Sequence, residues 1–86
     1  MGSYAITFAR SARKELEALP DQAVGKIFVK IELLSDNPRP RGCHKLEGEK
    51  HLWRIRVGEY RVIYAVSDSE KVVDIIRVRH RRDAYR

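Results

Sequence analysis

The chain has 86 residues, of which 43% are hydrophobic and 35% are charged, and its formal net charge is +6. This composition indicates one small folded domain and excludes an intrinsically disordered chain. No apolar run approaches the roughly 20 residues needed to cross a bilayer, so no membrane partner is expected. Cys43 is the single cysteine, which excludes an internal disulfide and indicates a reducing, cytoplasmic location.

The positive charge is concentrated in the second part of the chain. Residues 1–36 carry five basic and five acidic side chains, whereas residues 37–86 carry thirteen basic and seven acidic ones. Arginine outnumbers lysine by twelve to six, and a planar guanidinium matches phosphate geometry in a way that an ammonium does not. The distribution predicts a surface for a polyanion, with a merely solvated charged surface as the alternative.

The first part of the chain predicts a strand followed by a helical hairpin. Residues 4–9 are rich in β-forming side chains, after residues 2–3 that are typical of a cloning remnant. From Ser11, a predicted N-cap, apolar residues recur at helical spacing until Pro20 ends the helix. A second helix begins at Asp21. Its apolar face consists of Val24, Ile27, Phe28, Ile31 and Leu34.

The second part predicts a sheet. Residues 35–42 hold two prolines and a glycine and form an extended connection, and strands follow at residues 52–57, 60–67 and 71–79. We therefore expect one α+β domain over residues 1–86 with the order β-α-α-β-β-β. Its mostly antiparallel four-stranded sheet carries the helical hairpin on one face.

The dipeptide Gly58-Glu59 fixes the register of the first hairpin, because glycine stands where a type II′ turn requires it. This register places Arg56 opposite Arg61 and puts Arg54 on the same face, away from the helices. Burial of unpaired guanidinium groups is costly, so the last strand should direct its arginines to that face as well. We expect its core side to hold Val72, Ile76 and Val78. The predicted arginine face consists of Arg54, Arg56, Arg61, Arg77, Arg79 and Arg81.

Like charges directly opposite on a sheet cost about 0.2–1 kcal/mol per pair, so the arginine face indicates a function that offsets this cost. The alternative is a charged edge that deters aggregation. Clustered guanidiniums can stabilise a phosphorane without metal, and RNA carries its own nucleophile, the 2′-hydroxyl. His44 and His51 have no carboxylate pair at metal-binding spacing, so neither a metal nor a cofactor is expected. His80 and Tyr85 lie close enough to Arg81 in sequence to take part in proton transfer.

Four segments carry a resemblance to a known family: YAITFARSARKELEALP, NPRPRGCHKLEG, LWRIRVGEYRVIY and VRHRRDAY. Together they resemble the RelE/ParE toxin superfamily of prokaryotic toxin–antitoxin modules over nearly the whole chain. The resemblance implies the fold expected above. RelE-like members cleave mRNA in the ribosomal A site, without metal, leaving a 2′,3′-cyclic phosphate and a 5′-hydroxyl. ParE-like members poison DNA gyrase.

The resemblance also implies roles for individual residues. Arg54 and Arg56 match two basic strand positions that are lysines in the best-studied relatives, and Arg61 matches the arginine of the next strand. Arg81 matches the basic residue after the last strand, and Tyr85 the terminal catalytic tyrosine, although its spacing from Arg81 is shorter here. Some relatives use a histidine near this end, which keeps His80 as the alternative base. Contacts to the RNA backbone are expected from Arg39, Arg41, Lys45, Arg77 and Arg79.

The expected function is therefore a ribosome-dependent endoribonuclease that acts on mRNA, with the ribosome and a cognate antitoxin as partners. Two alternatives stay open. One is a gyrase inhibitor without catalysis of its own, and the other is an inactive homologue that retains only antitoxin binding. The convergence of Arg61, Arg81 and Tyr85 favours the nuclease, since inhibition of a protein does not require it.

Overall fold

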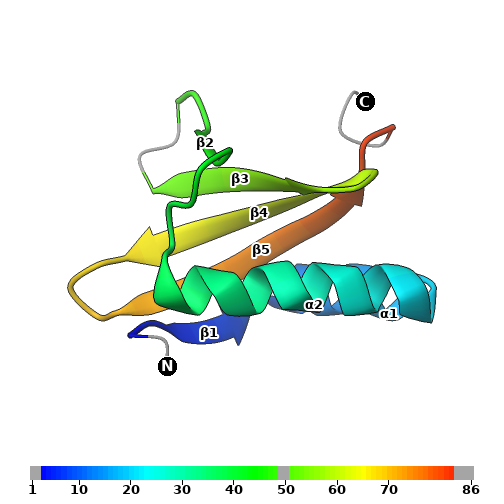
Figure 1. Ribbon diagram of the computed structural model, residues 1–86, viewed down its shortest axis with the longest axis horizontal. Coiled ribbons are helices and arrows are strands. Elements are labelled where there is room, and N and C mark those ends of the chain that lie inside the picture. Colours follow the sequence, from blue (N-terminus) through cyan, green and yellow to red (C-terminus); the bar gives the residue numbers. More distant parts are fainter. Residues whose placement is uncertain (1–2, 49–50, 83–86) are drawn as a thin grey trace.

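The computed structural model describes residues 3–48 and 51–82 as a five-stranded sheet packed against two helices (Figure 1). In chain order the elements are β1 (Ala5–Phe8), α1 (Arg10–Glu17), α2 (Asp21–Asp36), β2 (His44–Lys45), β3 (Leu52–Val57), β4 (Tyr60–Ser67) and β5 (Val72–His80). The strand order is β1-β5-β4-β3-β2, with β1 parallel to β5 and the other pairs antiparallel. The predicted α+β fold is confirmed, and the two-residue strand β2 adds a fifth member to the sheet.

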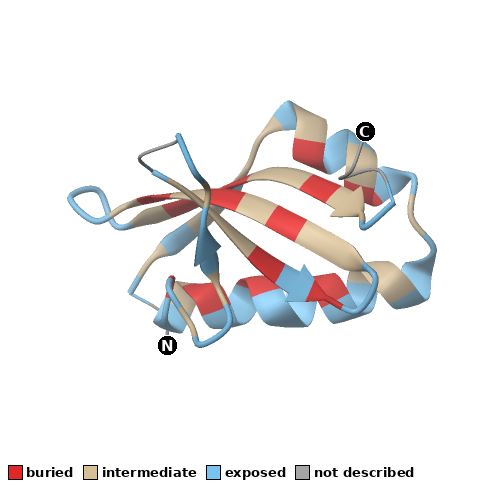
Figure 2. Cartoon of the chain, turned by 90° about the horizontal axis from the view of Figure 1, so that it is seen from above, coloured by how far each residue is buried: buried red, intermediate tan, exposed pale blue. Residues whose placement is uncertain are grey.

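Both helices contribute to one hydrophobic core, which covers a single face of the sheet. Alternate positions along β3 and β4 are buried, as the red bands on the strands in Figure 2 show. Five core residues come from the helices: Ala12, Leu16, Ile27, Ile31 and Leu34. The sheet supplies Ile55, Val57, Val62, Tyr64, Val66, Val73, Ile75 and Val78. No helix in the described part of the chain is long and apolar enough to span a membrane.

Helix α1 lies along the edge of β5 beyond the end of β1. Ser11 Oγ donates a hydrogen bond to the Ile76 carbonyl at 2.7 Å, and Glu15 Oε1 accepts one from the Val78 N–H at 2.8 Å. The prediction of Ser11 as N-cap is wrong, because α1 begins at Arg10 and the cap position is Ala9. The serine hydroxyl instead satisfies a strand carbonyl, so α1 closes an edge that would otherwise be open to pairing.

The extended connection after α2 packs against the end of the sheet that carries the β4–β5 turn, where Asp68 lies. The buried Tyr64 hydroxyl donates to the Pro38 carbonyl at 2.7 Å. Arg39 makes two hydrogen bonds to the Asp68 carboxylate, at 2.8 and 3.2 Å, and stacks 5.2 Å from the centre of the Trp53 ring. The Arg39 guanidinium, together with the Tyr4 hydroxyl, lowers the pKa of Asp68 to about 2. Burial raises the pKa of Tyr64 far above its ordinary value.

Strand β5 changes its alternation in mid-course. Ile63 pairs with Arg77 and the next residue, Tyr64, pairs with Ile75, so Ile76 is an extra residue at a β-bulge. The predicted core positions Val72 and Ile76 are therefore wrong, since Val73 and Ile75 are the fully buried residues before the bulge. After it Val78 is buried as predicted. The bulge lets one strand bury its apolar residues on both sides of the irregularity while Arg77 and Arg79 stay on the arginine face.

Candidate functional site: the arginine face

The pairing of the central strands places three arginines in one row across the sheet. Arg56 of β3 pairs with Arg61 of β4, and Arg61 pairs with Arg79 of β5. Next to this row, Ile63 lies between Arg54 and Arg77. The predicted register of the hairpin is confirmed, and Gly58, with a φ of 58°, occupies the turn position that favours glycine. The arginine face thus follows from the two-residue turn and from the alternation of side chains.

Two of these arginines are partly neutralised by helix α1. The Glu15 carboxylate lies 3.6 Å from Arg77 Nη1 and 3.4 Å from Arg79 Nε, while also accepting the hydrogen bond from Val78. Glu15 therefore fixes the β5 side of the arginine face to the helix. A carboxylate that already holds Arg77 and Arg79 reduces the attraction of these two arginines for an incoming phosphate.

Three other arginines of this face, Arg56, Arg61 and Arg81, come together at the end of the sheet where the β3–β4 turn approaches the end of β5 (Figure 1). A hollow of about 240 Å³ lies there. We call it the arginine hollow, and it is lined by Arg56, Gly58, Glu59, Tyr60, Arg61 and Arg81. Its volume is below the roughly 300–1,000 Å³ typical of pockets for drug-sized ligands.

Arg81 is attached to the hairpin turn by two contacts with Glu59. Its backbone N–H donates to the Glu59 carbonyl at 2.7 Å, and its Nε lies 3.4 Å from Glu59 Oε2. Both side chains are largely exposed. Sequence reasoning treated Glu59 only as a turn residue. The pairing register of β4 and β5 could have revealed this contact. Tyr60 pairs with His80 at the end of the two strands, and the residues next to this pair, beyond the strand ends, are Glu59 and Arg81.

His80 does not line the arginine hollow. The imidazole of His80 packs edge-on against Tyr60 at a ring distance of 5.3 Å, and its Nδ1 accepts a hydrogen bond from the Arg82 N–H at 3.2 Å. This arrangement puts His80 on the same side of β5 as the buried Val78, at the rim of the core. Tyr85 lies outside the described residues.

The basic residues predicted to contact RNA backbone lie in different surroundings. Arg39 is engaged with Asp68 and Trp53, and the hydrogen bond to Asp68 raises the pKa of Arg39. Lys45 is exposed and lies with Arg39 and Trp53 along a separate depression of about 730 Å³. Arg41 is exposed and shares a smaller hollow with Arg56. Arg41 thus extends the basic surface beyond the arginine hollow, whereas Arg39 fastens the connection.

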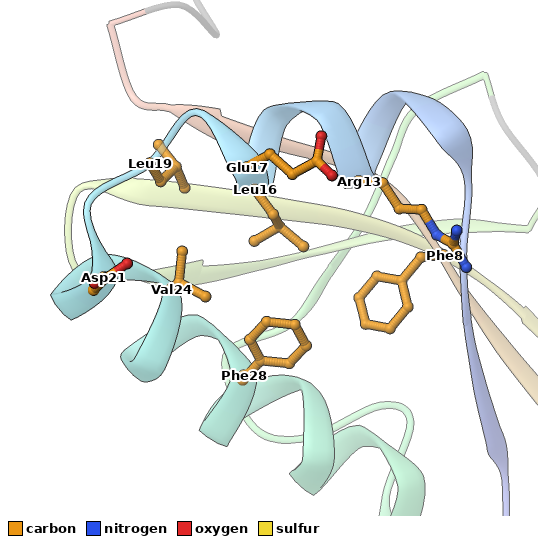
Figure 3. A pocket seen from close by; sticks show the side chains of 8 residues that line it. All are labelled: Phe8, Arg13, Leu16, Glu17, Leu19, Asp21, Val24 and Phe28. Atoms are coloured by element: carbon orange, nitrogen blue, oxygen red, sulfur yellow. The ribbon is translucent and has the colours of Figure 1, made fainter.

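An apolar groove of about 400 Å³ separates α1 from α2 (Figure 3). The rings of Phe8 and Phe28 meet there at a centroid distance of 5.7 Å, and Leu16 and Val24 line the groove between the helices. Its apolar lining does not suit phosphate chemistry. No group of three or more His, Cys, Asp or Glu that could hold a metal ion occurs within residues 3–48 and 51–82.

Comparison with known proteins gives a consistent result. The profile of the family described as "ParE toxin of type II toxin-antitoxin system, parDE" matches residues 6–85. The chain belongs to the RelE/ParE toxin superfamily. It is 32% identical over 76 residues to the putative toxin RelE1 of Methanocaldococcus jannaschii, with 85% of this chain and 84% of that protein covered.

Two solved structures of this superfamily share the fold. One is the archaeal RelE–RelB complex from Pyrococcus horikoshii, with a TM-score of 0.81, 32% identity, and coverage of 92% of this chain and 96% of that chain. The other is the RelBE2 toxin–antitoxin complex of Mycobacterium tuberculosis, with a TM-score of 0.81, 30% identity, and coverage of 91% and 98%. The resemblance inferred from the four sequence segments is confirmed.

Proposed function

We propose that this toxin is a ribosome-dependent endoribonuclease that cleaves mRNA in the ribosomal A site, without metal, by attack of the 2′-hydroxyl on the adjacent phosphate. The observation that carries the proposal is the meeting of Arg56, Arg61 and Arg81 around one hollow of about 240 Å³. Their positive charge can bind the scissile phosphate and stabilise the additional negative charge of the phosphorane.

In this mechanism the ribose supplies the nucleophile. The O2′–H bond breaks, O2′ bonds to phosphorus, the P–O5′ bond breaks, and the leaving O5′ takes up a proton. The products are a 2′,3′-cyclic phosphate and a 5′-hydroxyl. Arg61, which is half-buried on the central strand β4 and less exposed than Arg56 and Arg81, would hold the phosphate, with Arg56 beside it. Arg54 lies on the same face and would add to the positive potential.

The remaining roles fall to residues near the end of β5. Arg81 would stabilise or protonate the leaving oxygen. Tyr85, or failing it His80, would accept the proton of the 2′-hydroxyl, as the resemblance implies. Because Arg56 and Arg81 are exposed, the hollow does not by itself align RNA for in-line attack. We therefore expect little activity on free RNA and a requirement for the ribosome to orient the substrate.

We further propose a cognate antitoxin as the physiological partner of this toxin. The support is that both solved relatives were captured as RelE–RelB-type complexes. The net charge of +6 favours an antitoxin with an acidic toxin-binding segment. Such a segment would cover the arginine face and neutralise it while the toxin is held inactive.

The proposal is tested with purified toxin, ribosomes programmed with a defined mRNA, and mapping of new 5′ ends by primer extension. Wild type should cut only within the A-site codon, and Arg61→Ala and Arg81→Ala should each slow this cut at least about 100-fold, to a rate that a single-turnover assay still measures. Lys14→Gln, which removes one positive charge from an exposed position of α1, should cut as wild type does. A gyrase supercoiling assay runs in parallel, because the matching family profile is that of ParE. Intact mRNA with inhibited supercoiling would assign the protein to the gyrase inhibitors instead.

A further inference from the structure

We propose that Glu59 is a positioning residue, which holds the Arg81 guanidinium in the arginine hollow. The inference rests on the proposed function, because it assigns Arg81 a role in phosphate chemistry. It concerns the acidic residue of a hollow that is otherwise lined by three arginines, a tyrosine and a glycine. A carboxylate at a phosphate-binding site requires a reason, since it repels the ligand.

The position of Arg81 in the chain explains why it needs a partner. It follows the last residue of β5, and its side chain is 63% exposed, so the strand alone does not restrict its rotamers. A long exposed side chain loses rotamer entropy when it is fixed for catalysis. An arginine that must meet a phosphate at a defined place therefore gains from a group that restricts it before the substrate arrives.

Glu59 is placed to provide this restriction at two points. Its carbonyl accepts the Arg81 N–H at 2.7 Å and fixes the backbone, while its carboxylate lies 3.4 Å from Arg81 Nε and directs the guanidinium. Because the contact is made to Nε, the terminal amino groups of the guanidinium keep N–H donors for a phosphate. The carboxylate thus directs Arg81 without using all of its hydrogen-bonding capacity.

The energy of the ion pair is consistent with a positioning role and not with a stabilising one. The Glu59 side chain is 61% exposed, and exposed ion pairs contribute little to folding. Loss of the carboxylate should therefore leave the fold intact and affect the reaction. Two other roles make different predictions. A Glu59 that accepted the 2′-hydroxyl proton would act independently of Arg81, and a Glu59 that competed with phosphate would weaken RNA binding.

A double-mutant cycle separates these roles in single-turnover cleavage on programmed ribosomes. Glu59→Ala should lower the cleavage rate about 10- to 100-fold with little change in the half-saturating toxin concentration, as expected for a misplaced catalytic group. Glu59→Gln keeps an oxygen that can accept a hydrogen bond from Arg81 Nε, so it should lower the cleavage rate less than Glu59→Ala does. In the Arg81→Ala background, Glu59→Ala should have no further effect. Glu32→Gln, a charge-matched change on exposed α2, should behave as wild type.

Two outcomes of the cycle overturn the proposal. If Glu59→Ala keeps its full effect in the Arg81→Ala background, Glu59 acts on the substrate itself. If Glu59→Ala cleaves faster or binds RNA more tightly than wild type, the carboxylate is a competitor of phosphate.

A measurement without RNA distinguishes failure of this inference from failure of the proposed function. The Nε–Hε signal of Arg81 in ¹⁵N NMR should report a restricted side chain in wild type and a freely rotating one in Glu59→Ala. An unchanged signal overturns the positioning role whether or not the toxin cleaves RNA. A changed signal in a toxin that never cleaves would leave the contact in place and refute the nuclease.

Discussion

Arg56 and Arg61 lie directly opposite each other on the two strands of the β3–β4 hairpin. Like charges in this arrangement cost about 0.2–1 kcal/mol. Together with Arg81 they line the same hollow. The sheet thus has an unfavourable pair of like charges at the place where an anion would be bound. Functional sites commonly keep such arrangements although they lower the stability of the fold.

The first prediction concerns this pair. Arg56→Gln should raise the free energy of unfolding by about 0.2–1 kcal/mol, because it removes the repulsion with Arg61. It should also lower cleavage activity at least about 10-fold, because a phosphate contact is lost. Urea denaturation measures the first effect and primer extension the second. A variant that is less stable than wild type by more than about 0.5 kcal/mol would show that Arg56 contributes to folding and that the repulsion is screened.

The second prediction concerns the carboxylate that fastens α1 to β5. Glu15→Ala removes the acceptor for the Val78 N–H and the partner of Arg77 and Arg79. Its cost should be about 1.5 kcal/mol, the lower value for a hydrogen bond to a charged group, because the side chain is only partly buried. Glu15→Gln keeps the acceptor for the Val78 N–H, so it should lower the free energy of unfolding less than Glu15→Ala does.

Glu17→Ala, on the neighbouring exposed position of the same helix, is the control for Glu15. It should change the free energy of unfolding by no more than about 0.5 kcal/mol. Equal effects of the two variants on the free energy of unfolding would mean that the contacts of Glu15 with β5 do not stabilise the fold.

The third prediction concerns Tyr64 at alkaline pH. Burial raises the pKa of its phenol above the unfolded value. The stability that this contributes is therefore fully present below the ordinary tyrosine pKa of about 10 and is lost as the pH rises above it. Tyr64→Phe should remove this part of the alkaline loss, and should cost about 1–3 kcal/mol at neutral pH, since the buried Pro38 carbonyl loses its donor. An alkaline profile that is identical in both proteins would contradict the assignment.

The fourth prediction concerns Asp68 at acid pH. Its pKa is lowered to about 2 by Arg39 and Tyr4. A lowered folded pKa contributes stability that is present above the unfolded pKa of about 4 and is lost as the pH falls toward about 2. Asp68→Asn should flatten the stability profile in this window. A profile of Asp68→Asn that keeps the wild-type slope in this window would contradict the assignment.

The hairpin that carries the arginine face was predictable from sequence because its register depends on local chemistry. The glycine of Gly58-Glu59 sets the turn, and a two-residue turn leaves one pairing. With that pairing known, the alternation of β3 and β4 assigns Ile55 and Val62 to the core and Arg56 and Arg61 to the other face. The structure has this arrangement.

The alternation of β5 could not be predicted in the same way. The segment from Val72 to Ile76 has apolar residues in both parities, so the hydrophobic pattern does not reveal an extra residue. The bulge at Ile76 occurs where α1 approaches the strand edge and Ser11 binds the Ile76 carbonyl. This is a tertiary contact between residues 65 positions apart. The strand β2 has only two residues, which is too short for a periodic pattern.

The central claim, that the arginine hollow acts on the phosphate next to a reacting 2′-hydroxyl, is tested most directly by substrate substitution. Programmed ribosomes carry mRNA with a single 2′-deoxynucleotide at the cut position, and the fraction cleaved in one turnover is compared with that of the all-ribose message. We predict normal binding of the toxin and no cleavage at that position, whereas the all-ribose message is cut to a 2′,3′-cyclic phosphate. Cleavage of the deoxy-substituted message at the normal rate would contradict the mechanism and show that the nucleophile comes from elsewhere.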